Sequence, residues 1–342
     1  MPAERRAGGP LRVAIVGVGS AATRAHLPAL SAAEALGRVA VVGACDPDPS
    51  RRHAVTAAHP GAAGFADNEE MLEATSPELL VIATPPSVHL AEMAAALARG
   101  VHVLCEKPLG LTPADVSTLR ALARRHPDLA LATVHQYRHA QPWRWIARAA
   151  AGALRDGEGF SVAVRVERPG TDPLSAGGWR ADPEREGGIL GDHAVHYLAL
   201  LQLLDPLCRV TDCHREGPGG QEVAAVEVRL GAGGVARIHT SYAGARRSNL
   251  IHLDRPRQCL AVDWEDSSFR LARDGRRSSQ RAVPSLSDRR VVNALYTPMY
   301  HELITHLGEA SWRGEATART LGAADLLAGA MVRGGQWSGS RS

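Results

Sequence analysis

Three side chains in this sequence have the types and spacing needed for proton transfer at a hydroxyl or carbonyl group. Lys107 follows the apolar run Val103-Leu104-Cys105 and stands between Glu106 and Pro108. Further along, Asp192 and His196 are four positions apart, so on a helix they share one face. A positioned lysine, carboxylate and imidazole can together hold and move a proton during a reaction. We therefore take Lys107, Asp192 and His196 as catalytic candidates.

Two other interpretations of the Asp192 and His196 pair stay open at this point. The two side chains could form a buried pair that ties a helix to a sheet. They could also bind a metal ion with His193, but no fourth ligand stands at a characteristic spacing. Cys208 and Cys213 likewise fit no zinc pattern. We predict no metal site.

A glycine-rich turn near the start of the chain predicts a dinucleotide site. The run Gly17-Val18-Gly19-Ser20-Ala21-Ala22 matches the pattern G-x-G-x-x-G/A, between an apolar run at 11–16 and a predicted helix at 23–36. Gly17 permits a tight turn, Gly19 lets the backbone approach a pyrophosphate, and Ala22 is small enough for close packing. Phosphates would lie on the free N–H groups of the helix N-terminus, around Ser20 and Ala21. A turn without a ligand is the alternative.

The remaining cofactor candidates follow the ends of later apolar runs. Asp46 ends the second run and can accept hydrogen bonds from both ribose hydroxyls, which favours NAD. Arg51 and Arg52 come within one helical turn, and an arginine there can accommodate the 2′-phosphate of NADP, which is the alternative. The other candidates stand at the ends of the third and fourth runs or in the helix after the third run: Thr84, Pro85, His89, Glu106 and Lys107.

The order of apolar runs and helical patterns predicts an α/β protein with two domains. Residues 1–135 alternate short buried strands with helices, which indicates a doubly wound parallel sheet of the Rossmann type. Residues 136–334 predict an α+β domain with an open, mainly antiparallel sheet, because strand-like runs follow one another through turns. We expect a flexible tail at 335–342. The expected strands lie at 11–16, 39–45, 79–83, 101–105, 129–134, 160–167, 222–230, 235–242, 249–253, 259–264 and 269–272, with later helices at 189–204, 296–307 and 317–332.

Composition limits the class of protein. The 342 residues are 45% hydrophobic and 22% charged, which is typical of a globular protein. The net charge of +3 is too balanced to indicate nucleic-acid binding. The N-terminus lacks the apolar segment of a secretory signal, and no uncharged apolar stretch is long enough for a membrane span. We expect a cytoplasmic protein, and the five cysteines show no disulfide spacing.

Together, these motifs resemble the Gfo/Idh/MocA oxidoreductase family, the relatives of glucose–fructose oxidoreductase and inositol dehydrogenase. The resemblance covers residues 11 to about 205. It is carried by the glycine turn at 17–22, His26-Leu27-Pro28-Ala29-Leu30, Asp46, Thr84-Pro85-Pro86-Ser87-Val88-His89, Glu106-Lys107-Pro108, Tyr137-Arg138, Trp179-Arg180 and the segment 187–196.

The resemblance implies a Rossmann domain followed by a domain whose open sheet forms homodimers or homotetramers. It implies a nicotinamide cofactor and a sugar, a cyclitol or a derivative of one as substrate. Lys107 would hydrogen-bond the reacting oxygen, His196 would be the acid/base, and Asp192 would position the substrate or tune His196. The residues expected to line the substrate cleft are His26, Tyr137, Arg138, Trp179 and Arg180, with His193 at its border.

Two positions depart from the family pattern and leave the substrate subclass open. Glu186 stands where the family often has the first of three glycines, and Ala194 stands where it usually has a glycine. Our hypothesis is an NAD(P)-dependent dehydrogenase or reductase acting on a sugar-, cyclitol- or aminocyclitol-like alcohol or ketone. One alternative is an enzyme that uses tightly bound NAD for redox-assisted elimination or glycoside hydrolysis. Another is a non-catalytic protein that senses dinucleotides.

Overall fold

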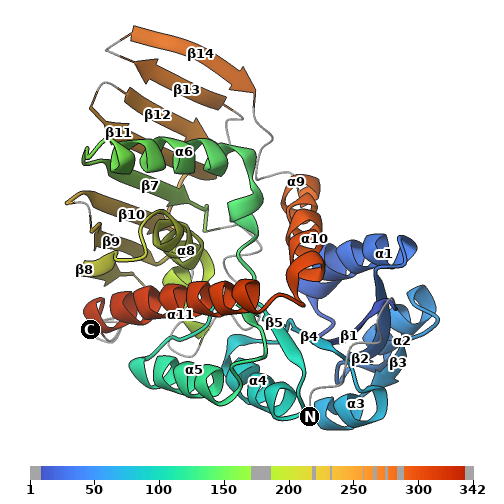
Figure 1. Ribbon diagram of the computed structural model, residues 1–342. Helices are drawn as coiled ribbons and strands as arrows, with labels where there is room; N and C mark the ends of the chain where they lie inside the picture. Colours follow the sequence, from blue (N-terminus) through green and yellow to red (C-terminus); the bar gives the residue numbers. More distant parts are fainter. Residues whose placement is uncertain are drawn as a thin grey trace. The chain divides into compact units, whose positions relative to one another are not determined.

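The chain forms two compact units, each with its own sheet (Figure 1). The structure is a computed structural model and describes residues 9–170, 186–217, 221–231, 233–256, 258–264, 268–273, 276–282 and 289–335. The first unit contains residues 1–109, 117–134 and 293–321, and the second contains 110–116, 135–292 and 322–342. The expected split at residue 135 into independent domains stays a prediction. Residues 336–342 of the expected tail lie outside the described residues.

The first unit contains a six-stranded parallel sheet in the order β3-β2-β1-β4-β5-β6. This order confirms the predicted doubly wound sheet. The central strand β4 is buried at every position, as expected for a parallel strand covered on both faces. The sequence analysis missed β3, because its three residues, Ala-Gly-Phe, are mostly exposed and carry no apolar run. The strands are β1 (Leu11–Val16), β2 (Val39–Cys45), β3 (Ala63–Phe65), β4 (Leu79–Ile82), β5 (His102–Cys105) and β6 (Leu131–Thr133).

Helices pack against this sheet, and one of them comes from far along the chain. Tyr296, Met299 and Tyr300 of α10 lie in the same buried cluster as Leu30 of α1. The sequence predicted helix α10 but gave no reason to place it beside β1 and α1. Three of the helices, α5, α9 and α11, have residues in both units. The helices with residues in the first unit are α1 (Leu27–Ala35), α2 (Pro49–Ala58), α3 (Asn68–Thr75), α4 (His89–Ala98), α5 (Pro113–Arg125), α9 (Arg289–Ala294), α10 (Tyr296–His306) and α11 (Ala310–Arg333).

The second unit contains an eight-stranded sheet in the order β14-β13-β12-β11-β7-β10-β9-β8. Neighbouring strands are antiparallel except β7 and β10, which pair in parallel. The sheet confirms the predicted, mainly antiparallel architecture. The sequence analysis missed β8 and β14. The strands are β7 (Ser161–Glu167), β8 (Arg209–Glu216), β9 (Val223–Arg229), β10 (Val235–Ser241), β11 (Ser248–Arg255), β12 (Gln258–Asp263), β13 (Ser268–Arg273) and β14 (Arg276–Ala282).

Helices cover one face of this second sheet. On β7, Val162, Val164 and Val166 are buried, while Ala163 and Arg165 on the other face are exposed, the period-two pattern of a sheet buried on one side. The helices α6 (Gln141–Arg155) and α8 (Val195–Leu204) lie over the buried face (Figure 1). We call the opposite side, which carries Ala163 and Arg165, the open face.

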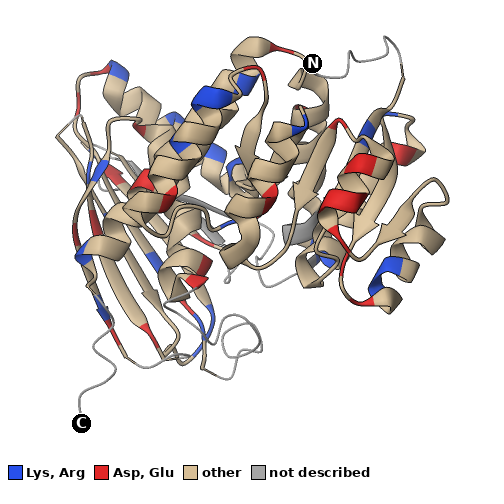
Figure 2. Cartoon of the chain, turned by 90° about the horizontal axis from the view of Figure 1, so that it is seen from below, with Lys and Arg blue, Asp and Glu red and all other residues tan. Residues whose placement is uncertain are grey.

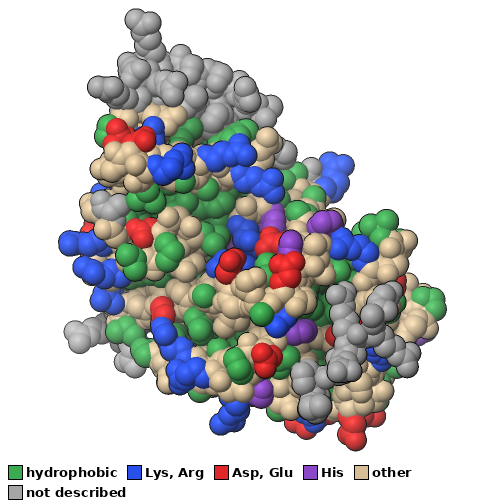
Figure 3. Space-filling model, viewed as in Figure 1, with side chains coloured by type: hydrophobic (Ala, Val, Ile, Leu, Met, Phe, Trp, Pro, Cys, Tyr) green, Lys and Arg blue, Asp and Glu red, His purple; other side chains and the backbone are tan. Residues whose placement is uncertain are grey.

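Lys and Arg residues are interspersed with Asp and Glu residues along the described helices, strands and loops (Figure 2). Helix α6 is amphipathic, with Trp143 and Ile146 buried and Arg144, Arg148 and Arg155 exposed, and Figure 3 shows this row of positive side chains along the helix. Among the described residues, no helix combines the length and the hydrophobicity that a bilayer crossing requires.

Candidate active site

The glycine turn after β1 has a shape that a side chain would destroy. Gly17 has a φ of +83°, a left-handed conformation that favours glycine. A Cβ atom at this position would lie 2.6 Å from the backbone nitrogen of Thr84 and 2.7 Å from the carbonyl carbon of Ala83. Gly17 is therefore required because the ends of β1 and β4 approach closely.

Gly19 serves a different purpose, because a Cβ atom there would meet nothing within 4 Å. The helix that begins in this turn, as the π-helical turn η1 (Ala22–His26), has no acidic residue in its first turn. Ser20 is exposed at its start and Ala22 is fully buried beneath it. Open space in front of the first amide groups of a helix would accommodate a pyrophosphate, and the role of this turn in cofactor binding stays a prediction.

Asp46 ties the end of β2 to this turn. Its Oδ2 accepts a hydrogen bond from the Val18 N–H at 2.8 Å, and its Oδ1 accepts one from the Asp48 N–H at 2.9 Å. Arg51 Nη1 lies 3.6 Å from Oδ2, and Arg52 Nη1 donates to the main-chain oxygen of Asp46 at 2.6 Å. Each carboxylate oxygen has two lone pairs, so Asp46 can still accept from a ribose hydroxyl. Arg51 and Arg52 are its neighbouring positive charges.

The loop after β4 is held through the predicted residues Thr84 and His89. His89 is buried; its Nε2 lies 2.9 Å from the main-chain oxygen of Thr84 and its Nδ1 lies 3.3 Å from that of Pro108. It therefore joins the loop after β4 to the loop after β5, while Pro85 precedes the short 3-10 turn η2 (Pro86–Val88). The Thr84 hydroxyl donates to Glu92 Oε2 at 2.6 Å. Burial raises the pKa of the Glu92 carboxyl to about 7, although the Thr84 hydrogen bond opposes this.

Lys107 follows a glutamate that is anchored from three directions. Glu106 Oε1 lies 3.0 Å from His26 Nε2 and accepts a hydrogen bond from the Tyr296 hydroxyl at 2.8 Å. Its Oε2 accepts the main-chain N–H of Lys107 at 3.2 Å. Tyr300 lies behind His26, with its hydroxyl 2.7 Å from His26 Nδ1. We call Glu106, His26, Tyr296 and Tyr300 the Glu106 network.

Burial alone would raise the pKa of the Glu106 carboxyl. The hydrogen bond and charge of His26, the Lys107 ammonium and the Tyr296 hydrogen bond outweigh burial and lower that pKa to about 2. Burial and the charge of Glu106 raise the pKa of Tyr300 well above its usual value. Glu106 is therefore a fixed carboxylate at neutral pH, and it holds the backbone of Lys107.

His26 contacts Glu106 and Tyr300. Its side chain is completely buried. Its expected place beside the substrate stays a prediction. The sequence analysis also missed Tyr296 and Tyr300, because they stand far from the other motifs. The two tyrosines stand four positions apart, on one face of a predicted helix, in a chain with only five tyrosines. That spacing was the signal that could have indicated a shared role.

In the second unit, Asp192 lies on the π-helical turn η5 (Leu190–Ala194), which leads into α8. Its Oδ2 accepts a hydrogen bond from the Tyr242 hydroxyl at 3.1 Å and lies 3.7 Å from His193 Nε2. The His193 ring meets the Tyr242 ring edge to face, with 5.6 Å between the ring centres. A tyrosine from the end of β10, which the sequence analysis missed, therefore fixes the Asp192 carboxylate.

His196 is held by aromatic rings. It stacks on Tyr137, with ring centres 4.5 Å apart, and Tyr137 meets Trp264 edge to face at 5.5 Å. Tyr137 and Arg138 belong to the 3-10 turn η3 (Gln136–His139), so the structure brings one predicted substrate residue, Tyr137, directly against His196. The predicted substrate residues Trp179 and Arg180 lie outside the described residues.

A buried ion pair holds the turn that precedes Asp192. Gly188 has a φ of +51°, and a Cβ atom there would lie 2.6 Å from the carboxylate oxygens of Glu222. Glu222 Oε2 accepts the N–H of Ile189 at 3.0 Å, and Glu222 Oε1 pairs with Arg215 Nη2 at 2.9 Å. The glycine is therefore needed because a buried carboxylate satisfies the first amides of the helix.

Comparison with known families agrees with this geometry in both halves of the chain. Residues 11–134 match the model of the oxidoreductase family with an NAD-binding Rossmann fold, GFO_IDH_MocA. Residues 148–262 match the model of the GFO/IDH/MocA C-terminal domain.

Individual relatives are oxidoreductases. A 1,5-anhydro-D-fructose reductase from Ensifer adhaerens is 32% identical over 204 residues, which cover 55% of this chain and 60% of the relative. The match thus spans less than two thirds of that relative's length. Two solved structures share the fold. A 3-ketoreductase from Actinomadura kijaniata in complex with NADP and TDP-benzene has a TM-score of 0.77 and 18% sequence identity, and the match covers 95% of this chain and 98% of that chain. Levoglucosan dehydrogenase in complex with NADH has a TM-score of 0.74 and 16% sequence identity, and the match covers 95% of this chain and 98% of that chain. The two family matches cover more than half of the residues, and this chain belongs to the Gfo/Idh/MocA oxidoreductase family.

Proposed function

We propose that this oxidoreductase interconverts a secondary alcohol and a ketone on a sugar, a cyclitol or an aminocyclitol. The observation that carries the proposal is the placement of Lys107 directly after Glu106, a buried carboxylate that is fixed by His26 and Tyr296 and accepts the main-chain N–H of Lys107. It follows β5 in a parallel sheet whose glycine turn has open space for a dinucleotide. In open α/β sheets, ligands bind outside the carboxyl ends of the strands.

The proposed roles follow from the chemistry of the reaction. A nicotinamide cofactor, when bound, accepts or supplies the hydride. Lys107 donates a hydrogen bond to the reacting oxygen and holds it in place. His196 takes the hydroxyl proton when the alcohol is oxidised and returns it when the ketone is reduced. Asp192, fixed by Tyr242, positions the substrate hydroxyls or orients His196. Tyr137, by stacking on His196, limits the rotation of the imidazole.

We propose NAD as the preferred cofactor, with NADP as the alternative. The buried Asp46 carboxylate stands at the end of β2, where its charge would repel a 2′-phosphate. Arg51 and Arg52 supply the competing influence, since an arginine beside the ribose can bind that phosphate. Calorimetric titration of the purified protein with both dinucleotides measures this preference, and tighter binding of NADP would reverse it.

One experiment tests the proposed roles. Purified protein is incubated with each dinucleotide and a panel of sugars, cyclitols and their keto derivatives, and absorbance at the nicotinamide band reports hydride transfer. Lys107→Ala should lower kcat by roughly a hundredfold or more, the usual scale for a positioned proton-transfer group, while the dissociation constant of the cofactor changes little. Unchanged turnover in Lys107→Ala would remove the lysine from the mechanism. Absence of cofactor binding by the unmodified protein would overturn the whole proposal.

We also propose that copies of this chain associate through the open face of the second sheet. This face carries small and apolar side chains, such as Ala163, Ala225 and Leu250, along a hollow of about 710 Å³. A large partly apolar surface of this kind is typical of an interface between subunits. Light scattering of the protein and of Ala225→Arg, which adds a charge to this face, measures the association; a monomeric unmodified protein would contradict the proposal.

A further inference from the structure

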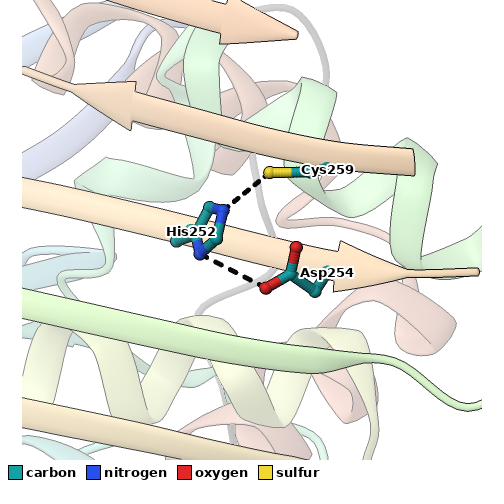
Figure 4. Close-up of side chains that lie close together, drawn as sticks. All are labelled: His252, Asp254 and Cys259. Carbon is teal, nitrogen blue, oxygen red and sulfur yellow. Dashed lines mark hydrogen bonds and ion pairs between the residues drawn. The ribbon is translucent and has the colours of Figure 1, made fainter. Parts of the chain in front are cut away.

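Three potential metal ligands meet on the open face of the second sheet, outside the cofactor and catalytic motifs, and one of them, His252, also lines the hollow of this face. His252 and Asp254 stand on β11 and Cys259 stands on the neighbouring strand β12 (Figure 4). Asp254 is the direct register partner of Cys259. His252 is two residues before Asp254 and thus on the same face of the strand. Strand geometry therefore places the three side chains together next to the β11–β12 turn.

The distances between the three side chains are short. His252 Nε2 lies 2.7 Å from Cys259 Sγ, and His252 Nδ1 lies 3.4 Å from Asp254 Oδ2. One ligand atom from each residue can be chosen so that all three lie within 4.8 Å of one another. Two ligand atoms around a tetrahedral zinc ion are roughly 3.5 Å apart, given bond lengths of about 2.0 to 2.3 Å. Because His252 Nε2 faces Cys259 and Nδ1 faces Asp254 (Figure 4), binding of one ion requires rotation of the imidazole or of the carboxylate.

We propose that His252, Asp254 and Cys259 bind a divalent cation of the zinc type through one imidazole nitrogen, one thiolate and one carboxylate oxygen. Thiolate and imidazole ligands favour zinc over magnesium or calcium, which take oxygen ligands. A thiolate and a carboxylate together neutralise the two positive charges of the ion. Three protein ligands leave a fourth position for water or another ligand.

The main alternative for the same residues is a reactive cysteine, with His252 as base and Asp254 as its orienting carboxylate. The contacts of His252 with Cys259 at 2.7 Å and with Asp254 at 3.4 Å fit both interpretations. The metal titration below distinguishes them, because only a bound cobalt ion gives a thiolate-to-cobalt charge-transfer band.

The neighbouring arginine does not compete for the carboxylate of Asp254. Arg255 is the next residue on β11, so its side chain leaves the sheet on the helix-covered face. There its Nη1 donates to the main-chain oxygen of Ala149 at 3.3 Å and lies 3.7 Å from Asp156 Oδ2, both of which belong to or end α6. The positive charge of Arg255 is therefore engaged on the opposite side of the sheet from the proposed site.

Side chains along β11 point alternately to the two faces of the sheet, and this alternation separates the proposed metal site from Asp192 and His196, the catalytic candidates of this unit. Ile251 and Leu253, the neighbours of His252, are fully buried on the helix-covered face, and η5 with Asp192 packs against β10. The sheet itself therefore stands between the metal site and Asp192. We infer that the metal stabilises the β11–β12 hairpin and takes no part in hydride transfer.

Metal titration of the full chain tests this proposal. The protein is treated with a chelator, dialysed, and titrated with zinc by calorimetry and with cobalt(II) by absorbance. We expect one zinc ion per chain, a thiolate-to-cobalt charge-transfer band in the near ultraviolet, and a higher unfolding temperature with zinc. Cys259→Ser should abolish the charge-transfer band, and both Cys259→Ser and His252→Ala should weaken zinc binding by at least about tenfold.

Matched controls keep the result specific. Cys208→Ser removes another partly exposed thiol, and His214→Gln removes an exposed imidazole on β8 of the same sheet. Both should bind zinc as the unmodified protein does. Equal zinc affinity in Cys259→Ser and the unmodified protein, or a cobalt spectrum without a thiolate band, would overturn the proposal. Turnover of Cys259→Ser should equal that of the unmodified protein, so the result is independent of the proposed oxidoreductase activity.

Discussion

The Tyr296 hydroxyl donates a hydrogen bond to Glu106 Oε1 at 2.8 Å, although 190 positions separate the two residues in the chain. Glu106 is the immediate neighbour of Lys107 and accepts its main-chain N–H. A helix near the C-terminal end of the chain thus stabilises the loop that carries the proposed catalytic lysine. The predictions below follow from this relationship and from its counterparts elsewhere in the structure.

Replacement of Tyr296 by phenylalanine should destabilise the first unit. The change removes one hydrogen bond to a buried carboxylate and keeps the ring packing, so the free energy of unfolding should fall by about 1.5 to 3 kcal/mol. Chemical denaturation measures the change. A loss below about 0.5 kcal/mol in Tyr296→Phe would show that this hydrogen bond contributes little.

The Glu106 carboxylate should make the protein sensitive to acid. Its pKa is lowered from 4.5 to about 2 in the folded state, so its contribution to stability is complete above pH 4.5 and is lost as pH falls from about 4.5 to 2. A shift of this size corresponds to at most about 3 kcal/mol. Unfolding free energy measured against pH should therefore decline through this window, and the decline should be shallower in Glu106→Gln. Parallel curves for the two proteins would contradict this assignment.

Glu92 should have the opposite effect on stability. Burial raises its pKa to about 7, so the folded state holds a proton that the unfolded state releases near pH 4.5. Stability from this group therefore falls as pH rises from about 4.5 to 7. Glu92→Gln keeps an oxygen for the Thr84 hydroxyl without the buried charge, and it should raise the unfolding temperature at pH 8. The unmodified protein and the variant should be nearly equal at pH 5; a lower unfolding temperature for the variant at pH 8 would refute this explanation.

Two glycines in one turn should respond differently to substitution. Gly19→Val places a side chain in open space, so the protein should fold normally but bind the dinucleotide at least about tenfold more weakly, since the pyrophosphate needs that space. In Gly17→Ala, the new Cβ atom would clash with the backbone of Thr84, and alanine would have to adopt a positive φ. This substitution should therefore lower the free energy of unfolding by more than about 2 kcal/mol. Calorimetry and denaturation distinguish the two effects. Normal cofactor affinity in Gly19→Val would contradict the placement of the pyrophosphate.

His102 should add a second acid-sensitive step. Its Nδ1 accepts the main-chain N–H of Ala130 at 3.0 Å, which requires the neutral ring. Burial and the nearby Arg313 lower its pKa from 6.5 to about 4, so its contribution to stability is lost as pH falls through that range. His102→Asn should flatten the stability curve between pH 6.5 and 4. An unchanged slope of unfolding free energy against pH in this range would mean that groups other than His102 cause the acid sensitivity.

The sequence by itself determined the features that depend on neighbours along the chain. Buried apolar runs alternating with helical patterns were sufficient for the parallel sheet, because strand and helix periodicities are local. The glycine turn was also predicted from the sequence, because its G-x-G-x-x-A pattern lies within six consecutive residues between a strand and a helix. The second sheet was predicted because strand-like runs follow one another through turns, whereas the side that β7 buries comes from the structure.

The tertiary structure alone decided which distant residues support the site. Tyr296 at Glu106, Tyr242 at Asp192, and Glu222 with Arg215 beneath Gly188 all depend on elements that come together only when the chain folds. The parallel pairing of β7 and β10 belongs to the same class, since both strands have the same local pattern whichever way they pair. Sequence patterns report which face of an element is buried, whereas hydrogen bonds between remote side chains are set by how those faces pack together.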